Sequence, residues 1–68
     1  MDKSHYVLKF RNCQSMDTLE KVYRRMEERS PPHPDIYNIT SAYDHRKAEL
    51  IMGKLYDKVP ASVWKYVD

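Results

Sequence analysis

The sequence predicts an all-α fold of four helices, in which a long third helix is packed by the others. Apolar residues recur at three- and four-residue spacing along most of the chain, which is typical of amphipathic helices. With 41% hydrophobic residues and a single glycine, the chain is too apolar and too regular for a disordered protein. Its 68 residues are near the lower limit for a stable core. We therefore expect residues 1–68 to form one helical domain of marginal stability.

The first helix is expected from Ser4, a suitable N-cap, to about Asn12. Three residues at spacing i, i+4 and i+7 form its apolar face: Tyr6, Phe10 and Cys13. Lys9 and Arg11 lie off that face and should meet solvent. Cys13 is therefore expected to be a small buried hydrophobic residue.

The second helix is expected from Met16 to about Arg29, after a short break. On its polar side, two acidic residues are each followed four positions later by a basic residue, a spacing that stabilises an exposed helix slightly. These pairs are Asp17 with Lys21 and Glu20 with Arg24.

A stiff loop at Ser30–Pro34 should separate the second helix from the third, because proline lacks an N–H and restricts the residue before it. The third helix is expected from Asp35 to about Asp57. Gly53 falls inside this range, so we expect close packing or a slight bend there.

Val59 and Pro60 then reverse the chain, and residues 61–67 form a last short helix. Three of its residues are expected to dock on the core: Val63, Trp64 and Val67. Trp64 should be shielded from water.

The third helix shows two apolar stripes, so it should have neighbours on two faces. The first stripe contains Ile36, Ile39, Tyr43 and Leu50, and the second contains Tyr37, Ala48, Ile51 and Leu55. Asp44 lies in line with the second stripe, within a polar turn that ends at Lys47. An unpaired buried carboxylate costs several kcal/mol. The Asp44 carboxylate is therefore either paired inside the domain or presented to a partner.

Charge and composition exclude several classes of protein. The net charge of +2 arises from twelve basic and ten acidic residues, which does not imply tight independent DNA binding. The single cysteine gives no support to a secreted disulfide scaffold. No export signal and no membrane-spanning segment is indicated, so a cytoplasmic protein is expected.

No catalytic or metal-binding motif stands out. Cys13, His5, His33 and His45 lack the short spacings of metal sites or nucleophile pairs. Asp44 and His45 are neighbours in a helix and point about 100° apart, so they cannot orient one another as a general-base dyad. We expect no enzyme activity, no cofactor and no metal.

Two groups of side chains could still contact a partner. The first group is basic: Lys9, Arg11, Lys21, Arg24, Arg25 and Arg29. Each of these side chains, taken singly, is expected to be solvated and paired with a local acid. Together they could attract DNA weakly. Most aromatic residues are typical of a core. Tyr37 and Tyr43 are exceptions, because they flank Asp44.

Several short motifs extend over nearly the whole chain. They are Asp44-His45-Arg46, Ala48-Glu49-Leu50, Lys54-Leu55-Tyr56-Asp57-Lys58, Pro60 and Ser62-Val63-Trp64, with Tyr6, Arg11, Cys13-Gln14 and Asp17-Thr18-Leu19-Glu20 upstream. With these motifs the chain resembles the Hha/YmoA family of small modulators of gene expression. The resemblance implies the same four-helix fold and a nucleoid-associated protein in the cytoplasm.

The resemblance also implies a partner, the N-terminal dimerisation domain of H-NS or of an H-NS paralogue. In the family an acidic surface meets arginines of that domain, and silencing of target genes is strengthened. The implied partner-binding residues are Asp44, Glu20, Asp17 and Tyr37, and the implied weak DNA-facing residues are Lys9, Arg11, Arg24 and Arg25. Two other functions remain open, an autonomous DNA-binding regulator and an antitoxin-like or purely structural interaction module.

Overall fold

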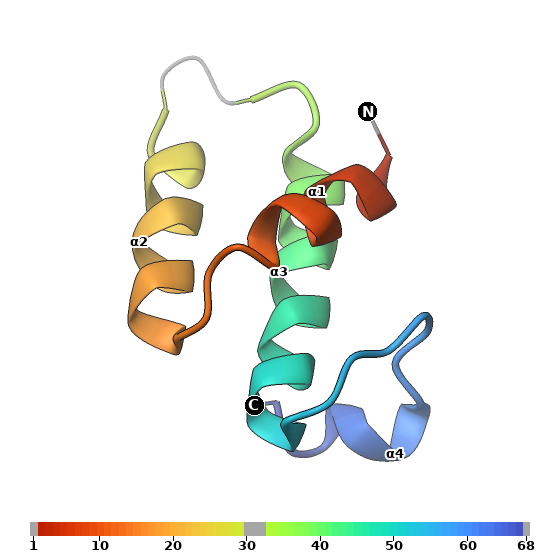
Figure 1. Ribbon diagram of the computed structural model, residues 1–68. Helices are drawn as coiled ribbons and strands as arrows, with labels where there is room; N and C mark the ends of the chain where they lie inside the picture. Colours follow the sequence, from red (N-terminus) through yellow and green to blue (C-terminus); the bar gives the residue numbers. More distant parts are fainter. Residues whose placement is uncertain (1, 30–32, 68) are drawn as a thin grey trace.

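Four helices make up the regular structure of residues 2–29 and 33–67, the part of the chain that the computed structural model describes (Figure 1). They are α1 (Lys3–Phe10), α2 (Met16–Glu27), α3 (Ile36–Met52) and α4 (Ala61–Trp64). The predicted all-α class with a long third helix is confirmed. In Figure 1, α1 crosses the first half of α3, while α2 runs antiparallel beside it. The short α4 contacts the far end of α3.

The first two helices begin at side-chain caps. Asp2, not Ser4, caps α1, because its carboxylate accepts the His5 N–H at 3.1 Å. The Ser15 hydroxyl accepts the Thr18 N–H at 3.3 Å and caps α2. Both caps satisfy backbone donors that a helix leaves unpaired in its first turn.

The third helix ends at Met52, earlier than its apolar pattern predicted. Gly53 has φ of 65°, and its N–H bonds the carbonyl of Glu49. It is therefore a left-handed C-cap, a conformation that glycine adopts without steric cost. The expected close packing at Gly53 is wrong, since nothing lies within 4 Å of the position that a Cβ would occupy. Likewise α4 ends at Trp64, although Val67 is still buried.

The beginning of α3 is tied to α1. The Tyr6 hydroxyl donates to the Asp35 carboxylate at 2.7 Å. The Asp35 N–H donates to Nδ1 of His33 at 3.0 Å, and α3 then starts at Ile36. Most of the predicted proline-rich loop, residues 30–32, lies outside the described part of the chain.

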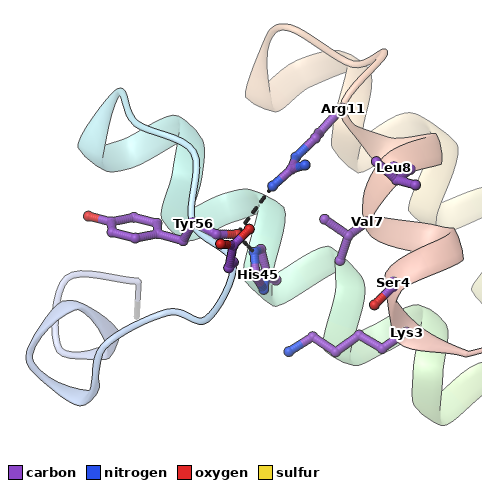
Figure 2. Close-up of a pocket in the computed structure, with 8 residues that line it drawn as sticks. Lys3, Ser4, Val7, Leu8, Arg11, His45 and Tyr56 are labelled. Atoms are coloured by element: carbon purple, nitrogen blue, oxygen red, sulfur yellow. Dashed lines mark hydrogen bonds between the residues drawn. The ribbon is translucent and has the colours of Figure 1, made fainter.

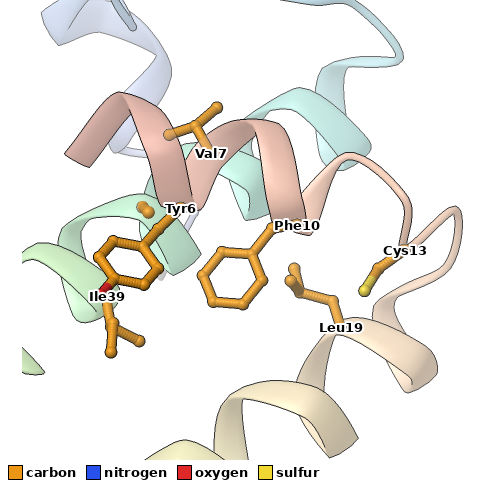
Figure 3. Packing of buried hydrophobic residues seen from close by; sticks show 7 residues of the cluster. Tyr6, Val7, Phe10, Cys13, Leu19 and Ile39 are labelled. Atoms are coloured by element: carbon orange, nitrogen blue, oxygen red, sulfur yellow. The ribbon is translucent and has the colours of Figure 1, made fainter. Parts of the chain in front are cut away.

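Two apolar clusters form the core. The larger joins α1, α2 and α3 (Figure 3) and consists of Tyr6, Val7, Phe10, Cys13, Leu19, Ile39 and Ala42. The prediction that Cys13 is buried is confirmed. The smaller cluster joins the end of α3 to the C-terminal segment and consists of Ala48, Val59, Val63 and Val67. Trp64 packs against the edge of the smaller cluster and is only half-buried, so its predicted shielding holds in part.

Candidate partner-binding surface

The polar turn in the middle of α3 is divided between the interior and the surface. His45 and Arg46 are 3% and 7% exposed, whereas Asp44 and Lys47 are half-exposed. Successive helical residues point about 100° apart, so α3 can send one pair inward and the other outward. The division depends on a buried acid one turn later, Glu49, which is 1% exposed.

Glu49 is the centre of a buried charged network. Arg11 donates to both carboxylate oxygens of Glu49, at 3.2 and 2.6 Å. Arg46 donates to Oε1 at 3.1 Å, and the Tyr56 N–H donates to Oε2 at 2.9 Å. Nε2 of His45 lies 3.4 Å from Oε2. The carboxylate is thus enclosed by donors from the end cap of α1, from α3 and from the loop after α3, as a buried charge requires.

The same network holds two backbone carbonyls. The carbonyl of Tyr56 accepts from Arg11 at 3.2 Å and from Nε2 of His45 at 2.8 Å (Figure 2). Arg46 donates to the carbonyl of Cys13 at 3.3 and 3.0 Å. The network therefore fixes both the α1–α2 connection and the C-terminal segment to α3.

The surroundings of Glu49 act on its pKa in opposite directions. Burial alone raises the pKa, because it disfavours the charged carboxylate. Hydrogen bonds from Arg11, from the Tyr56 N–H and from Arg46 outweigh burial and lower the pKa of Glu49 to about 2. The network thus keeps Glu49 ionised although it is buried.

Arg11, the residue that caps the end of α1, meets solvent only in part, whereas its place off the apolar face predicted exposure. Its side chain is 28% exposed, and its guanidinium pairs with Glu49. Figure 2 shows the same guanidinium directed toward Tyr56 and His45. A cleft of about 260 Å³ opens beside it, between α1 and the Tyr56 loop. Arg11 turns inward because it forms an ion pair with Glu49. The apolar periodicity of the first helix does not reveal this pairing, since Glu49 lies on a different helix.

Tyr43, the residue just before the polar turn, contacts α2. The ring of Tyr43 on α3 stacks on Tyr23 of α2, with centroids 4.0 Å apart and planes at 4°. Burial raises the pKa of Tyr43, and the negative charges of Glu20 and Asp44 raise it further. Glu20 and Asp44 therefore both lie near enough to influence the same tyrosine, although 24 positions separate them in the sequence.

Asp17, Glu20 and Asp44 are termed the acidic surface below. Asp17 lies one turn before Glu20 on α2, and both are exposed. Within residues 2–29 and 33–67, none of the three carboxylates makes an ion pair or a hydrogen bond. The expected pairs of Asp17 with Lys21 and of Glu20 with Arg24 do not close to 4.0 Å. The acidic surface is therefore not neutralised by the described part of the chain.

Tyr37 is separated from the acidic surface. It lies seven residues before Asp44 on the same face of α3, about 10 Å away at ~1.5 Å per residue. Its side chain is 87% exposed. Ile51, on the same stripe, is 44% exposed, and Leu55 lies beyond the helix at 63% exposed. The predicted second packing stripe is therefore wrong except at Ala48, since this face of α3 meets solvent.

The predicted basic residues do not form one patch. Lys9 and Arg25 line a groove of about 420 Å³ between α1 and α2, together with Arg29 and His33. Arg24 does not line this groove, and its charge lowers the pKa of Tyr43 against the effect of the acids. The structure thus brings together two of the four predicted DNA-facing residues.

Sequence reasoning missed the role of Glu49. Its spacing from His45 and Arg46, four and three residues, was the available signal, because such residues share a face of a helix. Its interhelical partner Arg11 left no comparable pattern. The stacking of Tyr23 on Tyr43 was also missed, although Tyr43 was recognised as a neighbour of Asp44.

Two further features of the described residues are the hydropathy of the helices and the grouping of possible metal ligands. None of the helices in residues 2–29 and 33–67 has the length and hydropathy needed to span a bilayer. In the same ranges, no three His, Cys, Asp or Glu side chains gather as a possible metal site.

Comparison with known proteins identifies the family. Residues 8–65 match the model of the haemolysin expression modulating protein family. The chain is also 43% identical over 70 aligned positions to proteins named Transcription modulator YdgT from Salmonella typhimurium LT2 and Salmonella typhi. Each alignment covers 98% of this chain and 99% of the relative. The chain therefore belongs to the haemolysin expression modulating protein family.

Proposed function

We propose that this protein modulates transcription by binding the N-terminal dimerisation domain of H-NS, or of an H-NS paralogue, through its acidic surface. The observation that carries the proposal is that Asp17, Glu20 and Asp44 make no ion pair within the described residues, while the Tyr23–Tyr43 stack joins the two helices that carry them. The resemblance to the Hha/YmoA family supplies the partner. Its relatives named as transcription modulators support the biological role.

The acidic surface suits a partner that presents arginines. Carboxylates that are not neutralised within the protein lose little by accepting an external guanidinium, because no internal ion pair must break first. Complementary charge also speeds the encounter between two proteins at moderate ionic strength. The contact of α2 with α3 sets the spacing of the backbone positions that carry Glu20 and Asp44, so the surface favours a partner whose cations match that spacing.

The proposed role is that of a binding protein, not an enzyme. Its action requires no cofactor, metal or small-molecule substrate, since the recognition chemistry is ion pairing between two proteins. We place it in the cytoplasm at the nucleoid, where a partner bound to DNA is found.

Replacing Asp44 by asparagine should weaken partner binding and leave the fold intact. The variant keeps the side-chain volume but loses the charge, which should cost about 2 kcal/mol, or roughly 30-fold in Kd. Calorimetric titration with the N-terminal domain of H-NS measures the effect, and circular dichroism checks the fold. Asp57→Asn is the matched control, because Asp57 is exposed in the loop after α3. Equal affinities for wild type and Asp44→Asn would contradict the proposal.

A weak direct contact with DNA is the second candidate, and the basic groove favours it. Lys9, Arg25, Arg29 and His33 surround one groove, whose apolar floor is formed by Val22 and Met26. Phosphate contacts of this kind are strongly salt-dependent. In this proposal the protein is brought to DNA mainly by its complex with H-NS, and its own contact with DNA is weak.

Gel retardation separates this candidate from an autonomous DNA-binding regulator. We expect the isolated protein to retard duplex DNA at low salt and to fail at physiological salt. The double variant Lys9→Gln/Arg25→Gln should abolish the low-salt shift, while Lys21→Gln removes a cation outside the groove and should retain it. Retardation by the isolated protein at physiological salt would instead establish the autonomous regulator.

A further inference from the structure

The outer face of Tyr43 has the features of a site for a cation. Tyr23 covers one face of the ring at 4.0 Å, and its hydroxyl lies 3.0 Å from the Thr40 hydroxyl, which holds the pair in register. The stack covers one face of the Tyr43 ring and leaves the opposite face as the one that a cation can approach. The faces of aromatic rings carry negative charge density that attracts ammonium and guanidinium groups.

The two neighbouring carboxylates strengthen that attraction. Glu20 lies one turn before Tyr23 on α2, and Asp44 directly follows Tyr43 on α3, so both belong to the Tyr23–Tyr43 contact; both carboxylates raise the pKa of the Tyr43 hydroxyl. A planar guanidinium can stack on an aromatic ring and donate to a carboxylate at the same time, which a compact ammonium does less well. The arrangement therefore fits arginine better than lysine.

A cation of the chain itself already lies at this face. The ammonium of Lys47, one turn after Tyr43 on α3, lies over the Tyr43 ring at 5.2 Å from its centroid. It does not come within 4.0 Å of Asp44 or Glu20, since neither carboxylate makes an ion pair in the described ranges. Lys47 thus covers the ring but leaves the hydrogen-bonding capacity of the carboxylates unused.

We propose that the Tyr43 face between Glu20 and Asp44 binds an arginine side chain of the partner, and that Lys47 occupies this face in the free protein as an internal competitor. The partner's guanidinium displaces the Lys47 ammonium, stacks on Tyr43 and pairs with a carboxylate. The inference rests on the proposed function of the acidic surface and adds two residues to it. Lys47 lowers the affinity and Tyr43 raises it.

Removing the competitor should tighten binding. Lys47→Met retains the aliphatic stem and removes the charge, and the affinity for the N-terminal domain of H-NS should rise by roughly two- to fivefold, the range of an exposed cation–π contact. Lys21→Met is the matched control, because Lys21 follows Glu20 directly on α2 and its loss changes the net charge equally. Of the three cation–π contacts in the described ranges, none involves Lys21. The gain should be clearly larger for Lys47→Met than for Lys21→Met.

A double-mutant cycle assigns the difference to the ring. In a Tyr43→Leu background the advantage of Lys47→Met over Lys21→Met should vanish, whereas in a Tyr43→Phe background it should persist, because phenylalanine keeps the aromatic face. Thermal unfolding of each variant confirms that the proteins compared are folded. Equal gains for the two lysine variants, or an advantage that survives Tyr43→Leu, would overturn the inference.

Nuclear magnetic resonance tests displacement without any substitution. The ε-methylene protons of Lys47 should be shifted upfield by the Tyr43 ring in the free protein, and should return toward their usual position when the H-NS N-terminal domain is added. Persistence of the upfield shift in the complex would show that the ammonium is not displaced.

The two proposals fail in different ways. If Asp44→Asn leaves the affinity unchanged, the acidic surface does not bind this partner and the proposed function is wrong. If Asp44→Asn weakens binding while the Lys47 and Tyr43 variants behave like their controls, the proposed function stands and only this inference fails.

Discussion

Replacing Glu49 by glutamine should destabilise the protein by about 3–5 kcal/mol, the cost of removing one partner from a buried ion pair. Glutamine preserves the shape but removes the charge that Arg46 and Arg11 share. Arg46 is 7% exposed and cannot reach water without moving. Domains of ordinary size have only about 5–15 kcal/mol of stability, so the loss should unfold much of this small protein.

Urea unfolding followed by circular dichroism measures the effect of Glu49→Gln. Glu28→Gln is the matched control, because it removes one carboxylate from an exposed position at the end of α2. The control should change the free energy of unfolding by less than ~0.5 kcal/mol. A midpoint for Glu49→Gln close to that of the control would show that the network contributes little.

The pH dependence provides an independent check on Glu49. Its pKa falls from an ordinary value of 4.5 to about 2 in the folded protein. A group whose pKa is lowered by folding contributes its full stability above the unfolded pKa and loses it as the pH falls through the folded pKa. The contribution, up to about 3 kcal/mol, should therefore disappear between pH 4.5 and 2. The stability difference between wild type and Glu49→Gln should narrow over that window.

Replacing Phe10 by alanine should cost about 3–5 kcal/mol, as expected for a large aromatic residue in a core. Phe10 is 0% exposed at the centre of the larger cluster, between Tyr6 and Leu19 (Figure 3). Neighbours on α1, α2 and α3 surround it, so the cavity cannot collapse by moving one helix alone. Thermal unfolding monitored at 222 nm is the measurement, and a lowered or absent transition is the expected result.

Trp64→Ala is the informative comparison for Phe10→Ala. Trp64 is larger, and its position after the turn predicted full burial. In the structure it lies half-buried at the edge of the smaller cluster. We expect a cost of about 2 kcal/mol, since only part of its area leaves water on folding. A greater loss for Trp64→Ala than for Phe10→Ala would mean that the smaller cluster dominates stability.

The local signals in the sequence were enough for the helices and the main core. Helical periodicity placed Phe10 and Cys13 inside. The same reading extended α3 past Met52, because the apolar pattern continues while the backbone reverses at Gly53. Helix ends depend on one conformation at one residue, which periodicity does not detect.

The sequence by itself determined the fold class, the family and the unusual position of Asp44, because these depend on spacing along one helix or on motifs read in order. The tertiary structure decided which polar residues are buried and which charges remain available to a partner. Arg11 was drawn inward by Glu49, and Glu20 was brought to the same tyrosine as Asp44. Such pairings depend on the angle and register at which helices cross, and those are set by side-chain packing between segments far apart in the chain.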